Sequence, residues 1–351
     1  MASFRIAVIA GDGIGREVIP AGMAAMAAVS RASDITLSFT EFPWGCEFYR
    51  QHGRMMDEDG FEQLAKYDAI YLGAIGAPGV SDAASAALIL AIRQRFDQYV
   101  NLRPMRLLPG LTSPLAGRGA ADIDMMCVRE NSEGEYSGVG GRVHRGTPHE
   151  VAQQVGVFTR QGIERILRYG FELAAARPRT LLASATKSNA LTHSMVLWDE
   201  IAEIVRKDYP SVEYRKYHVD ALAARMITHP QTLDVLVASN LFGDILTDIG
   251  SAISGGLGIA PGANINPTRR FPSMFEPIHG SAPDIAGKGI ANPIGAIWAG
   301  ALMMDHLGRR DLHDRILGAV ERVVGNHTLR TPDLGGSATT TEVGKAIVEE
   351  I

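Results

Sequence analysis

The sequence predicts an α/β protein built from two domains. Apolar segments that read as buried strands alternate along the chain with amphipathic helical segments. Such alternation is typical of α/β folds, in which helices cover a largely parallel sheet. The length of 351 residues also exceeds the roughly 250–300 residues at which a single core stops growing. We therefore expect two cores rather than one.

The first part of the chain alternates strands, glycine-rich segments and helices. The expected elements are, in order, a strand at residues 4–10, the segment Gly11-Asp12-Gly13-Ile14-Gly15, a helix over about 16–30, a strand at 68–72, a glycine-rich segment at 73–79 and a helix over about 84–100. Pro104 disfavours helical backbone at Arg103, which ends this last helix. The first glycines do not match G-x-G-x-x-G, and no acidic strand end follows about 20 residues later, so a Rossmann site is not predicted.

Four later strands each end in side chains able to perform acid–base or metal chemistry. Residues 121–128 lead to Arg129 and Tyr136, residues 180–185 to Lys187 and Asn189, residues 212–217 to Asp220, and residues 233–239 to Asp244 and Asp248. In open α/β sheets, ligands bind beyond the carboxyl ends of the strands. The four strand ends therefore predict a common site.

The three aspartates suggest a divalent metal. Asp244 and Asp248 are four residues apart, so on a helix they share one face, where two like charges repel unless a cation lies between them. Asp220 adds a third carboxylate from another strand end. Oxygen ligands without Cys or His neighbours suit Mg²⁺ or Mn²⁺ better than Zn²⁺.

Lys187 and Tyr136 are the candidates for proton transfer. Lys187 follows an apolar strand that buries its backbone, and close to a metal it can accept or relay a proton. Tyr136 can serve as the matching acid. Three arginines, Arg93, Arg103 and Arg129, are candidates for holding a substrate with two carboxylates, because guanidinium groups bind carboxylates in a two-pronged geometry.

The segment at residues 276–284 is the better nucleotide candidate. Its small residues allow close approach of the backbone, and Asp284 can accept hydrogen bonds from ribose hydroxyls while repelling a 2′-phosphate. Residues 250–267 are rich in Gly, Ala, Pro and Asn and are expected to form a crossover or hinge. Two final helices are expected after it, at about 293–306 and 311–325.

Composition excludes several classes of function. The net charge of −5 and the pI near 6.1 argue against a nucleic-acid-binding surface. The only two cysteines, Cys46 and Cys127, form no metal-like spacing and suggest a reducing compartment. No secretory signal is evident before the first strand, and no apolar stretch reaches the ~20 residues of a membrane helix. These observations favour a cytoplasmic protein that does not bind membranes.

Taken together, these motifs resemble the metal-dependent β-decarboxylating dehydrogenases, the family of isocitrate, isopropylmalate, tartrate and D-malate dehydrogenases. The resemblance covers essentially the whole chain. It rests on Gly11–Gly15, on the segment from Asp97 to Pro104, on Val128-Arg129-Glu130-Asn131 with Tyr136, on the segment from Asn240 to Asp248, and on His279-Gly280-Ser281-Ala282-Pro283-Asp284. Trp44, the segment from Ala185 to Asn189, Glu135-Tyr136-Ser137 and Phe158-Thr159-Arg160 are most similar to the tartrate and D-malate branch.

The resemblance implies an isopropylmalate-dehydrogenase-like two-domain fold that is not Rossmann. Residues 1–100 and 256–351 would form a cofactor-binding domain, and residues 101–255 a domain for substrate, metal and dimerisation. In the resulting homodimer, Lys187 and Asp220 would reach the partner's site and complete the metal shell of Asp244 and Asp248. The implied cofactor residues are His279, Gly280, Ser281, Ala282, Asp284, Ile285 and Asn292, and the implied substrate ligands are Arg93, Arg103, Arg129 and Asn189.

The implied activity is NAD-dependent oxidation and decarboxylation of a (2R)-malate-type 2-hydroxy diacid, D-malate or tartrate, with Mg²⁺ or Mn²⁺ and with K⁺ as a further candidate. Asp284-Ile285 resembles the NAD-using members, whereas NADP-using members place Lys-Tyr there. The segment at 85–90, which lines the variable group of the substrate in the family, is small and apolar, with Ala86 where isopropylmalate members carry glutamate. A 3-isopropylmalate-like enzyme for a bulkier diacid is therefore one alternative, and a catalytically silent nucleotide- or diacid-binding regulator is another.

Overall fold

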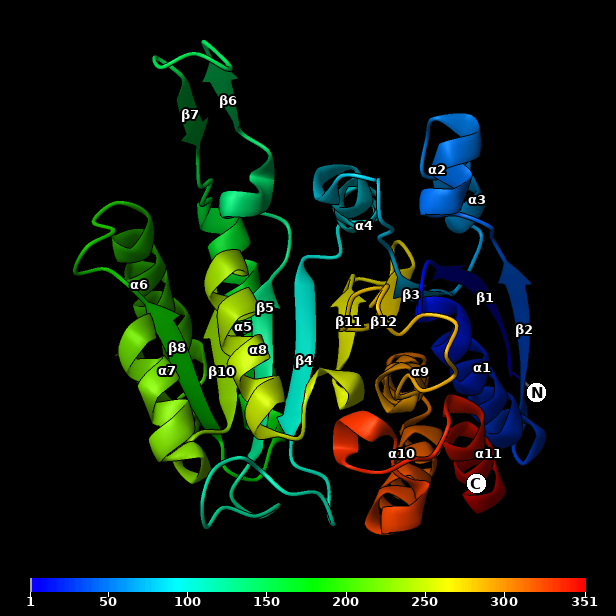
Figure 1. Ribbon diagram of the computed structural model, residues 1–351. Helices are drawn as coiled ribbons and strands as arrows, with labels where there is room; N and C mark the ends of the chain where they lie inside the picture. Colours follow the sequence, from blue (N-terminus) through cyan, green and yellow to red (C-terminus); the bar gives the residue numbers. More distant parts are fainter. Residues whose placement is uncertain (1) are drawn as a thin grey trace. The chain divides into compact units, whose positions relative to one another are not determined.

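The computed structural model describes residues 2–351, and Figure 1 shows its helices and strands. The chain divides into two compact units. The first comprises the chain up to Gln98, Arg106–Ala120 and Ser251–Ile351, and the second comprises Tyr99–Met105 and Ala121–Gly250. The expected middle domain of residues 101–255 differs from the observed second unit mainly at residues 106–120. Residues 106–120 are part of the first unit, to which they are joined by hydrogen bonds. For example, Ser113 Oγ donates to the carbonyl oxygen of Ile253 at 2.7 Å.

The first unit contains strands and helices from both ends of the chain. In chain order they are β1 (Ala2–Gly11), α1 (Gly15–Arg31), β2 (Ile35–Glu41), α2 (Cys46–His52), α3 (Gly60–Leu64), β3 (Ala69–Ala74), α4 (Asp82–Arg95), β11 (Pro261–Ile265), β12 (Ser273–Pro277), α9 (Ile294–His306), α10 (Arg310–Gly325) and α11 (Thr340–Glu350). The strand order is β2-β1-β3-β12-β11. The pairs of β1 with β2, β1 with β3 and β12 with β3 are parallel, and β11 is antiparallel to β12.

The core of this unit lies between the sheet and a helical layer. All six residues of β3 are buried, as expected for a central strand covered on both faces. Helices α1, α9, α10 and α11 pack on one another, and α1 and α9 also contact the sheet. Tyr71 of β3 donates its hydroxyl to the Ala296 carbonyl oxygen at 2.6 Å. A Cβ at position 22 of α1 would lie 1.7 Å from that hydroxyl, so the tyrosine can cross the helix only at Gly22.

Helix α4 ends five residues earlier than the expected end at about residue 100. Asp97 adopts a left-handed backbone conformation with φ of +43°, and the Gln98 amide donates to the Arg93 carbonyl oxygen at 2.9 Å. This hydrogen bond is the helix-ending pattern in which an amide reaches back five residues. Pro104, which was expected to follow the helix end, lies instead within the next strand.

The C-terminal part of the structure contains the two expected helices and one further helix. Helices α9 and α10 match the two expected helices within two residues. The expected crossover or hinge at 250–267 contains the end of α8 and all of β11, and all five residues of β11 are buried. Helix α11 was not expected. Thr339 and Glu342 begin it with a reciprocal capping box.

The second unit surrounds a sheet with the strand order β4-β5-β10-β8-β9. Its elements are β4 (Val100–Arg106), β5 (Asp124–Glu130), the 3₁₀ turn η1 (Glu135–Ser137), β6 (Gly140–Val143), β7 (Val151–Gln154), α5 (Arg160–Ala176), β8 (Leu181–Thr186), α6 (Ser194–Val205), β9 (Glu213–His218), α7 (Val219–Thr228), β10 (Val235–Ala238) and α8 (Asn240–Ile253). The pairs β5–β10, β10–β8 and β8–β9 are parallel. The carboxyl ends of these four strands therefore lie along one edge of the sheet.

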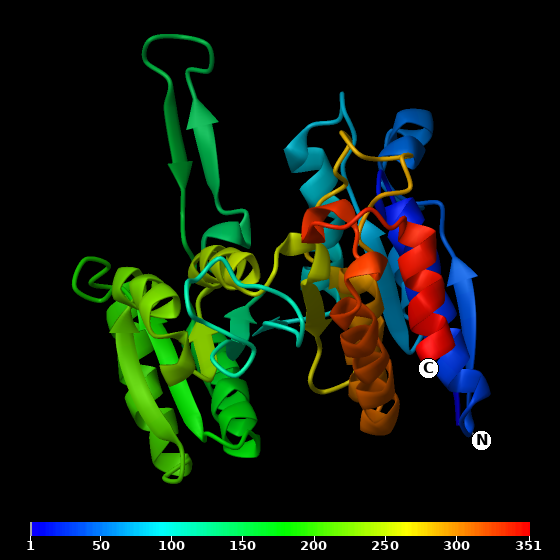
Figure 2. The ribbon, with the colours of Figure 1, turned by 60° about the horizontal axis from the view of Figure 1, so that its bottom comes forward.

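Strands β6 and β7 form a separate antiparallel hairpin that projects from the second unit (Figures 1 and 2). All eight of its strand residues are exposed. Four valines in or next to the strands expose about half of their surface: Val139 48%, Val143 58%, Val151 48% and Val155 46%. The other residues of 2–351 therefore leave these apolar side chains half exposed. A lone two-stranded hairpin is at best marginally stable in water.

Among residues 2–351, no helix has both the length and the apolar character required to span a membrane.

Candidate active site

The carboxyl ends of β5 and β10 bring three predicted site residues together. Arg129 is the sixth residue of β5, Tyr136 lies on the turn η1 that follows it, and Asp244 is on α8, directly after β10. Tyr136 donates its hydroxyl to Asp244 Oδ2 at 3.0 Å, and Arg129 forms an ion pair with Asp244 Oδ1. Asp244 is therefore the centre of this cluster.

The guanidinium of Arg129 is held in a fixed orientation. Only 2% of Arg129 is exposed. Asn240 Oδ1 accepts from its Nε at 3.2 Å and from one terminal nitrogen at 2.7 Å. A Cβ at position 243 would lie 2.6 Å from Arg129 Cγ, so the arginine can cross α8 only where the helix carries Gly243. Asn240 and Gly243 belong to the segment from Asn240 to Asp248 that carried the family resemblance, but nothing in the sequence pattern pointed to these roles.

Arg103 approaches the same carboxylate from β4. One of its terminal nitrogens lies 3.5 Å from Asp244 Oδ1 and donates to Thr247 Oγ1 at 2.7 Å. Its Nε donates to Asn101 Oδ1 at 2.8 Å. Two guanidinium groups thus converge on one acidic side chain. Their combined positive charge exceeds the negative charge of Asp244, so they can bind a further anionic group. Asn101 and Thr247 are positioning residues that the sequence did not reveal.

Tyr136 is suited to donate a proton. Removal from water raises the pKa of its hydroxyl, and the neighbouring Asp244 charge raises it further. The Arg129 guanidinium lies 5.6 Å from the centre of the Tyr136 ring, a distance typical of a cation–π contact. The tyrosine therefore stays protonated at neutral pH and is oriented by both partners.

Asp244 and Asp248 are the two predicted metal ligands that lie on the same helix. They lie one turn apart on α8. The pKa of the Asp248 carboxyl lies above its usual value, mainly because the side chain is partly removed from water. Arg103 opposes this increase, and the Asp244 charge adds to it. The carboxylate of Asp248 forms no hydrogen bond or ion pair with any other residue in 2–351. A divalent cation would relieve the repulsion between the two carboxylates, so the donor set fits Mg²⁺ or Mn²⁺.

Lys187 and Asp220 form a second, separate pair. Lys187 Nζ donates to Asp220 Oδ1 at 2.8 Å, from the ends of β8 and β9. This bond lowers the pKa of the Asp220 carboxyl. Within residues 2–351 no three acidic, histidine or cysteine side chains gather into a metal site, so the structure does not bring Asp220 to Asp244 and Asp248 within one chain. Asn189 is exposed near Lys187, where it borders a cavity of about 490 Å³.

The predicted nucleotide loop in the first unit carries an unpartnered acceptor. His279 Nδ1 donates to the Gly280 carbonyl oxygen at 2.9 Å, which leaves Nε2 as the acceptor of a neutral ring. Burial lowers the pKa of His279 and so keeps the ring neutral. Nε2 is buried, and no group in the described chain bonds to it. Such an atom fits an N–H donor on a ligand, such as the amino group of adenine.

The rest of this loop is also compatible with a dinucleotide. Ala282 has a φ of +40°, a strained conformation for a residue other than glycine, and such residues are enriched at ligand-binding sites. Asp284 is exposed and forms no hydrogen bond or ion pair with residues 2–351, so its carboxylate is free to accept from hydroxyls. Asn292 has a structural role as well: it donates to Asp333 at 3.0 Å and accepts from the Ile294 amide.

The first glycine segment supports this loop rather than forming a Rossmann turn. The Ile14 amide donates to the Ser281 carbonyl oxygen at 2.9 Å. A Cβ at Gly13, whose φ is +53°, would lie 2.0 Å from that oxygen. Glycine is therefore required for the close contact between the two loops.

Arg93 lies in the first unit with its guanidinium bonded to Glu276 at 2.9 Å. Its side chain is buried, and its Nε has no partner within the described chain. Ser85, Ala86 and Ile89 of the same helix border a cavity of about 570 Å³, together with Gly280, Ser281 and Pro283 of the nucleotide loop. The segment expected to contact the variable group of a substrate thus borders open space.

The chain is similar to known proteins over nearly its whole length. Residues 5–347 match the model of the isocitrate/isopropylmalate dehydrogenase family. The chain is 54% identical to the D-malate dehydrogenase (decarboxylating) of Escherichia coli, with 100% of this chain and 99% of the relative covered. It is 51% identical to the tartrate dehydrogenase/decarboxylase of Pseudomonas putida, with 99% and 98% covered.

A solved structure has the same fold. The isocitrate dehydrogenase from Methylococcus capsulatus superposes with a TM-score of 0.88 at 34% sequence identity, covering 99% of each chain.

Proposed function

Because the chain belongs to the isocitrate/isopropylmalate dehydrogenase family, we propose that it oxidises and decarboxylates a (2R)-malate-type 2-hydroxy diacid with NAD⁺ and Mg²⁺ or Mn²⁺. The chain is a decarboxylating dehydrogenase, like the relatives that match its full length. The observation that carries the proposal is the convergence of Arg103, Arg129 and Tyr136 on Asp244. Two fixed cations and a proton donor beside a carboxylate suit a doubly anionic substrate that loses CO₂.

The arginines bind and orient the diacid. Arg103 and Arg129 are held by Asn101, Thr247 and Asn240, so they present donors in fixed directions. Preorganised guanidinium groups gain affinity because little side-chain entropy remains to be lost on binding. In the proposal, Arg93 contributes a third guanidinium and Asn189 a further polar contact.

Lys187 and Tyr136 move the protons. Lys187 passes a proton to Asp220, to which it donates a hydrogen bond, and takes up the proton of the substrate hydroxyl during oxidation at C2. The C–C bond to the β-carboxylate then breaks and CO₂ leaves. Tyr136, which keeps its proton at neutral pH, delivers it to the resulting enol carbon. The products are a 2-keto acid, CO₂ and the reduced cofactor.

The cofactors supply the remaining chemistry. The loop of His279, Gly280, Ser281, Ala282, Asp284 and Ile285, together with Asn292, would hold NAD⁺, which would supply the hydride acceptor for the oxidation at C2. Asp244 and Asp248, together with Asp220 of the partner subunit, would hold the divalent metal, which would supply a Lewis acid for the oxygen on C2. The acidic Asp284 favours NAD⁺ over NADP⁺, because it would face the added phosphate with like charge. K⁺ is a further candidate ligand.

A homodimer completes the proposed site. Lys187 and Asp220 form a pair apart from Asp244 and Asp248, as expected if they serve the site of a partner subunit. The valines of the β6–β7 hairpin offer an apolar surface for such a partner. Both cysteines are free and buried, which suits the cytoplasm as the proposed compartment.

One observation favours a second substrate. The cavity beside Ala86 and Ile89 is about 570 Å³ and is mostly lined by small or apolar residues. Such a lining accepts an alkyl group more readily than the polar substituent of tartrate. A 3-isopropylmalate-like diacid is therefore the alternative substrate.

A substrate panel tests the proposal. NADH formation is measured with Mn²⁺ and D-malate, both forms of tartrate, 3-isopropylmalate and isocitrate, and the ratio of kcat/KM values ranks them. We expect D-malate or a tartrate to rank first. A higher rank for 3-isopropylmalate selects the alternative, and no turnover of any diacid would instead indicate a catalytically silent binding protein.

Mixing two impaired variants tests the shared site. Chains with Lys187→Ala and chains with Tyr136→Phe are unfolded together and refolded as a mixture. If each site combines Lys187 of one chain with Tyr136 of the other, mixed dimers contain one intact site and part of the activity returns. Activity no higher than that of the separate variants would contradict the shared site.

A further inference from the structure

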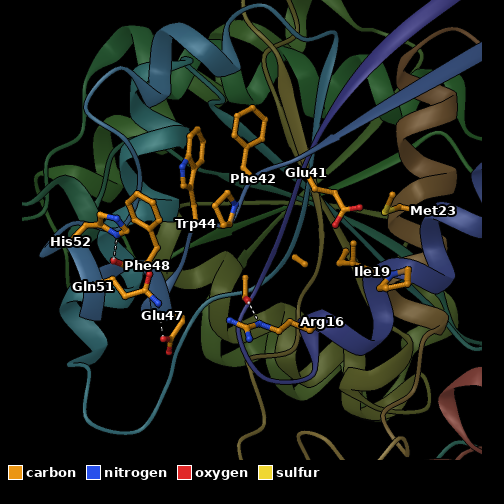
Figure 3. A pocket seen from close by; sticks show the side chains of 14 residues that line it. Arg16, Ile19, Met23, Glu41, Phe42, Trp44, Glu47, Phe48, Gln51 and His52 are labelled. Carbon is orange, nitrogen blue, oxygen red and sulfur yellow. Dashed lines mark hydrogen bonds between the residues drawn. The ribbon is translucent and has the colours of Figure 1, made fainter.

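A large cavity of the first unit lies outside the site described above. It measures about 750 Å³ and is bordered by α1, the end of β2 and α2. That volume is within the range of about 300–1,000 Å³ of small-molecule sites. Figure 3 shows that Arg16, Ile19 and Met23 line it from α1, whereas Phe42, Trp44, Phe48 and His52 line it from the segment after β2. We call these last four residues the aromatic wall.

The aromatic wall is held in place by its own contacts. The Phe42 and Trp44 rings lie 4.4 Å apart, and Phe48 stacks on His52 at 4.1 Å. Trp44 Nε1 donates to Asp57 Oδ2 at 3.2 Å, and only 1% of this residue is exposed. A preformed set of rings binds a flat apolar group with little loss of side-chain entropy.

Two opposite charges in the cavity lack partners. Arg16 donates only its Nε, to the Gly11 carbonyl oxygen at 2.9 Å, and within residues 2–351 its terminal nitrogens bond to nothing. Glu41, the last residue of β2, has no hydrogen bond or ion pair from its carboxylate in the same range. Glu47 differs, because its two oxygens accept from Gln51 at 3.0 Å and Arg50 at 3.3 Å. Arg16 and Glu41 are therefore the charged groups available to a ligand.

Both helical walls of the cavity are tied to the nucleotide loop. Arg16 bonds to Gly11. Asp12 accepts from the Cys46 amide at 3.0 Å, at the start of α2, and from the Gly76 amide at 3.0 Å. The Ile14 amide in turn donates to Ser281. A ligand that shifts α1 against α2 would act directly on the Gly11–Gly15 segment and, through it, on the loop at 279–285.

We propose that this cavity is a regulatory site for a free aromatic amino acid. Its carboxylate binds the terminal nitrogens of Arg16, its ammonium group binds Glu41, and its ring packs on Phe42 and His52, the two members of the aromatic wall that are not buried. A guanidinium matches a carboxylate with two parallel hydrogen bonds, and a carboxylate is the matching partner of an ammonium group. Occupancy restrains the Gly11–Gly15 segment and thereby the loop at 279–285. This site is independent of the substrate and metal residues.

Calorimetric titration of the purified full-length chain, without cofactor or metal, tests binding. The probes are L-phenylalanine, 3-phenylpropionate (which lacks the ammonium group), 2-phenylethylamine (which lacks the carboxylate) and L-alanine (which lacks the ring). We expect L-phenylalanine to bind at least about tenfold more tightly than each of the others, because each omits one contact to a charge or to the rings. Absence of L-phenylalanine binding at millimolar concentration, or equal binding of 3-phenylpropionate, would overturn the proposal.

Variants with matched controls locate the site. Arg16→Gln and Glu41→Gln should each weaken L-phenylalanine binding at least about tenfold. Arg31→Gln, at the far end of the same helix, and Glu58→Gln, outside the cavity, should leave it unchanged. The four changes are at exposed positions, and a thermal melt of each variant verifies its fold. Wild-type affinity in Arg16→Gln would place binding elsewhere.

Amide hydrogen exchange tests the connection to the nucleotide loop and needs no bound NAD⁺. Saturating L-phenylalanine should slow exchange at residues 11–15 and 279–285 in the wild type and leave it unchanged in Arg16→Gln. Slowing confined to α1 and α2 would refute the regulatory part of the proposal. Since neither experiment involves turnover, an inactive enzyme would count against the proposed function alone.

Discussion

Gly243→Ala should damage the active site while making the helix itself more favourable. Alanine in place of glycine in a helix interior gains about 1 kcal/mol. In α8, however, the new Cβ would lie 2.6 Å from Arg129 Cγ and 2.7 Å from Arg129 Cβ. The arginine is buried, so these atoms cannot swing into solvent. Overpacking of this kind costs about 1–3 kcal/mol, so we expect a net loss of about 1 kcal/mol in the free energy of unfolding.

The kinetic effect should be much larger than the loss of stability. Displacement of Arg129 breaks its bonds to Asn240 and its ion pair with Asp244. A shift of about 1 Å in a positioning group can cost about 10²-fold in rate, and we expect a decrease of that size in kcat/KM for the diacid. Steady-state NADH formation and urea unfolding of the same preparation measure the two effects.

A second helix glycine provides the control. At Gly318 of α10, the nearest atom to an added Cβ is Arg322 Nη1 at 3.4 Å, the end of a flexible side chain. Gly318→Ala should therefore stabilise the protein by about 1 kcal/mol and leave kcat/KM unchanged. If Gly243→Ala were stabilised like Gly318→Ala, or kept wild-type kcat/KM, Arg129 would not be held as we describe.

Three further predictions concern single steps, the cofactor and pH. Lys187→Ala should suppress oxidation itself, whereas Tyr136→Phe should mainly slow decarboxylation or enol protonation, each by about 10²–10⁴-fold. The oxidation and the decarboxylation are assayed separately for each variant. Equal losses of both half-reactions would contradict these roles. Asp284→Lys with Ile285→Tyr should shift the kcat/KM ratio toward NADP⁺ without fully reversing it, and an unchanged ratio would mean that Asp284 does not face the ribose. Burial, with a smaller effect of Arg269, lowers the pKa of His306 from 6.5 to about 4. Between these values only the unfolded chain takes up the proton, so the free energy of unfolding falls by about 3 kcal/mol as the pH drops from about 6.5 to 4. His306→Gln should lose that part of the pH dependence in urea unfolding curves, and identical curves for both proteins would refute the assignment.

The sequence predicted those parts of the fold and site that depend on local pattern. Apolar segments ending in Arg129, Lys187, Asp220 and Asp244 were expected to be strands, and each of these residues lies at a strand end or just after one. The family and the α/β two-domain fold expected from the motifs are confirmed by the family match and the superposition. Hydrophobic periodicity and short motifs predict these features because both depend only on residues that are close together in the sequence.

Features that depend on distant contacts were not predictable. Helix α4 ends at Arg95 because Asp97 turns left-handed, and no proline or glycine marks that point. The partners of Arg103, namely Asn101 and Thr247, are ordinary polar residues until the fold brings them together. The unpaired charges of Arg16 and Glu41 are likewise evident only once the surrounding elements are placed.

The most direct test of the proposed reaction is its stoichiometry. NADH, CO₂ and the 2-keto acid are measured in one reaction of the full-length protein with D-malate, NAD⁺ and Mn²⁺, and again with excess EDTA. We predict equal amounts of the three products, none of them with EDTA, and full recovery when Mn²⁺ is restored. NADH formed without CO₂, or turnover that persists in EDTA, would contradict a metal-dependent oxidative decarboxylation.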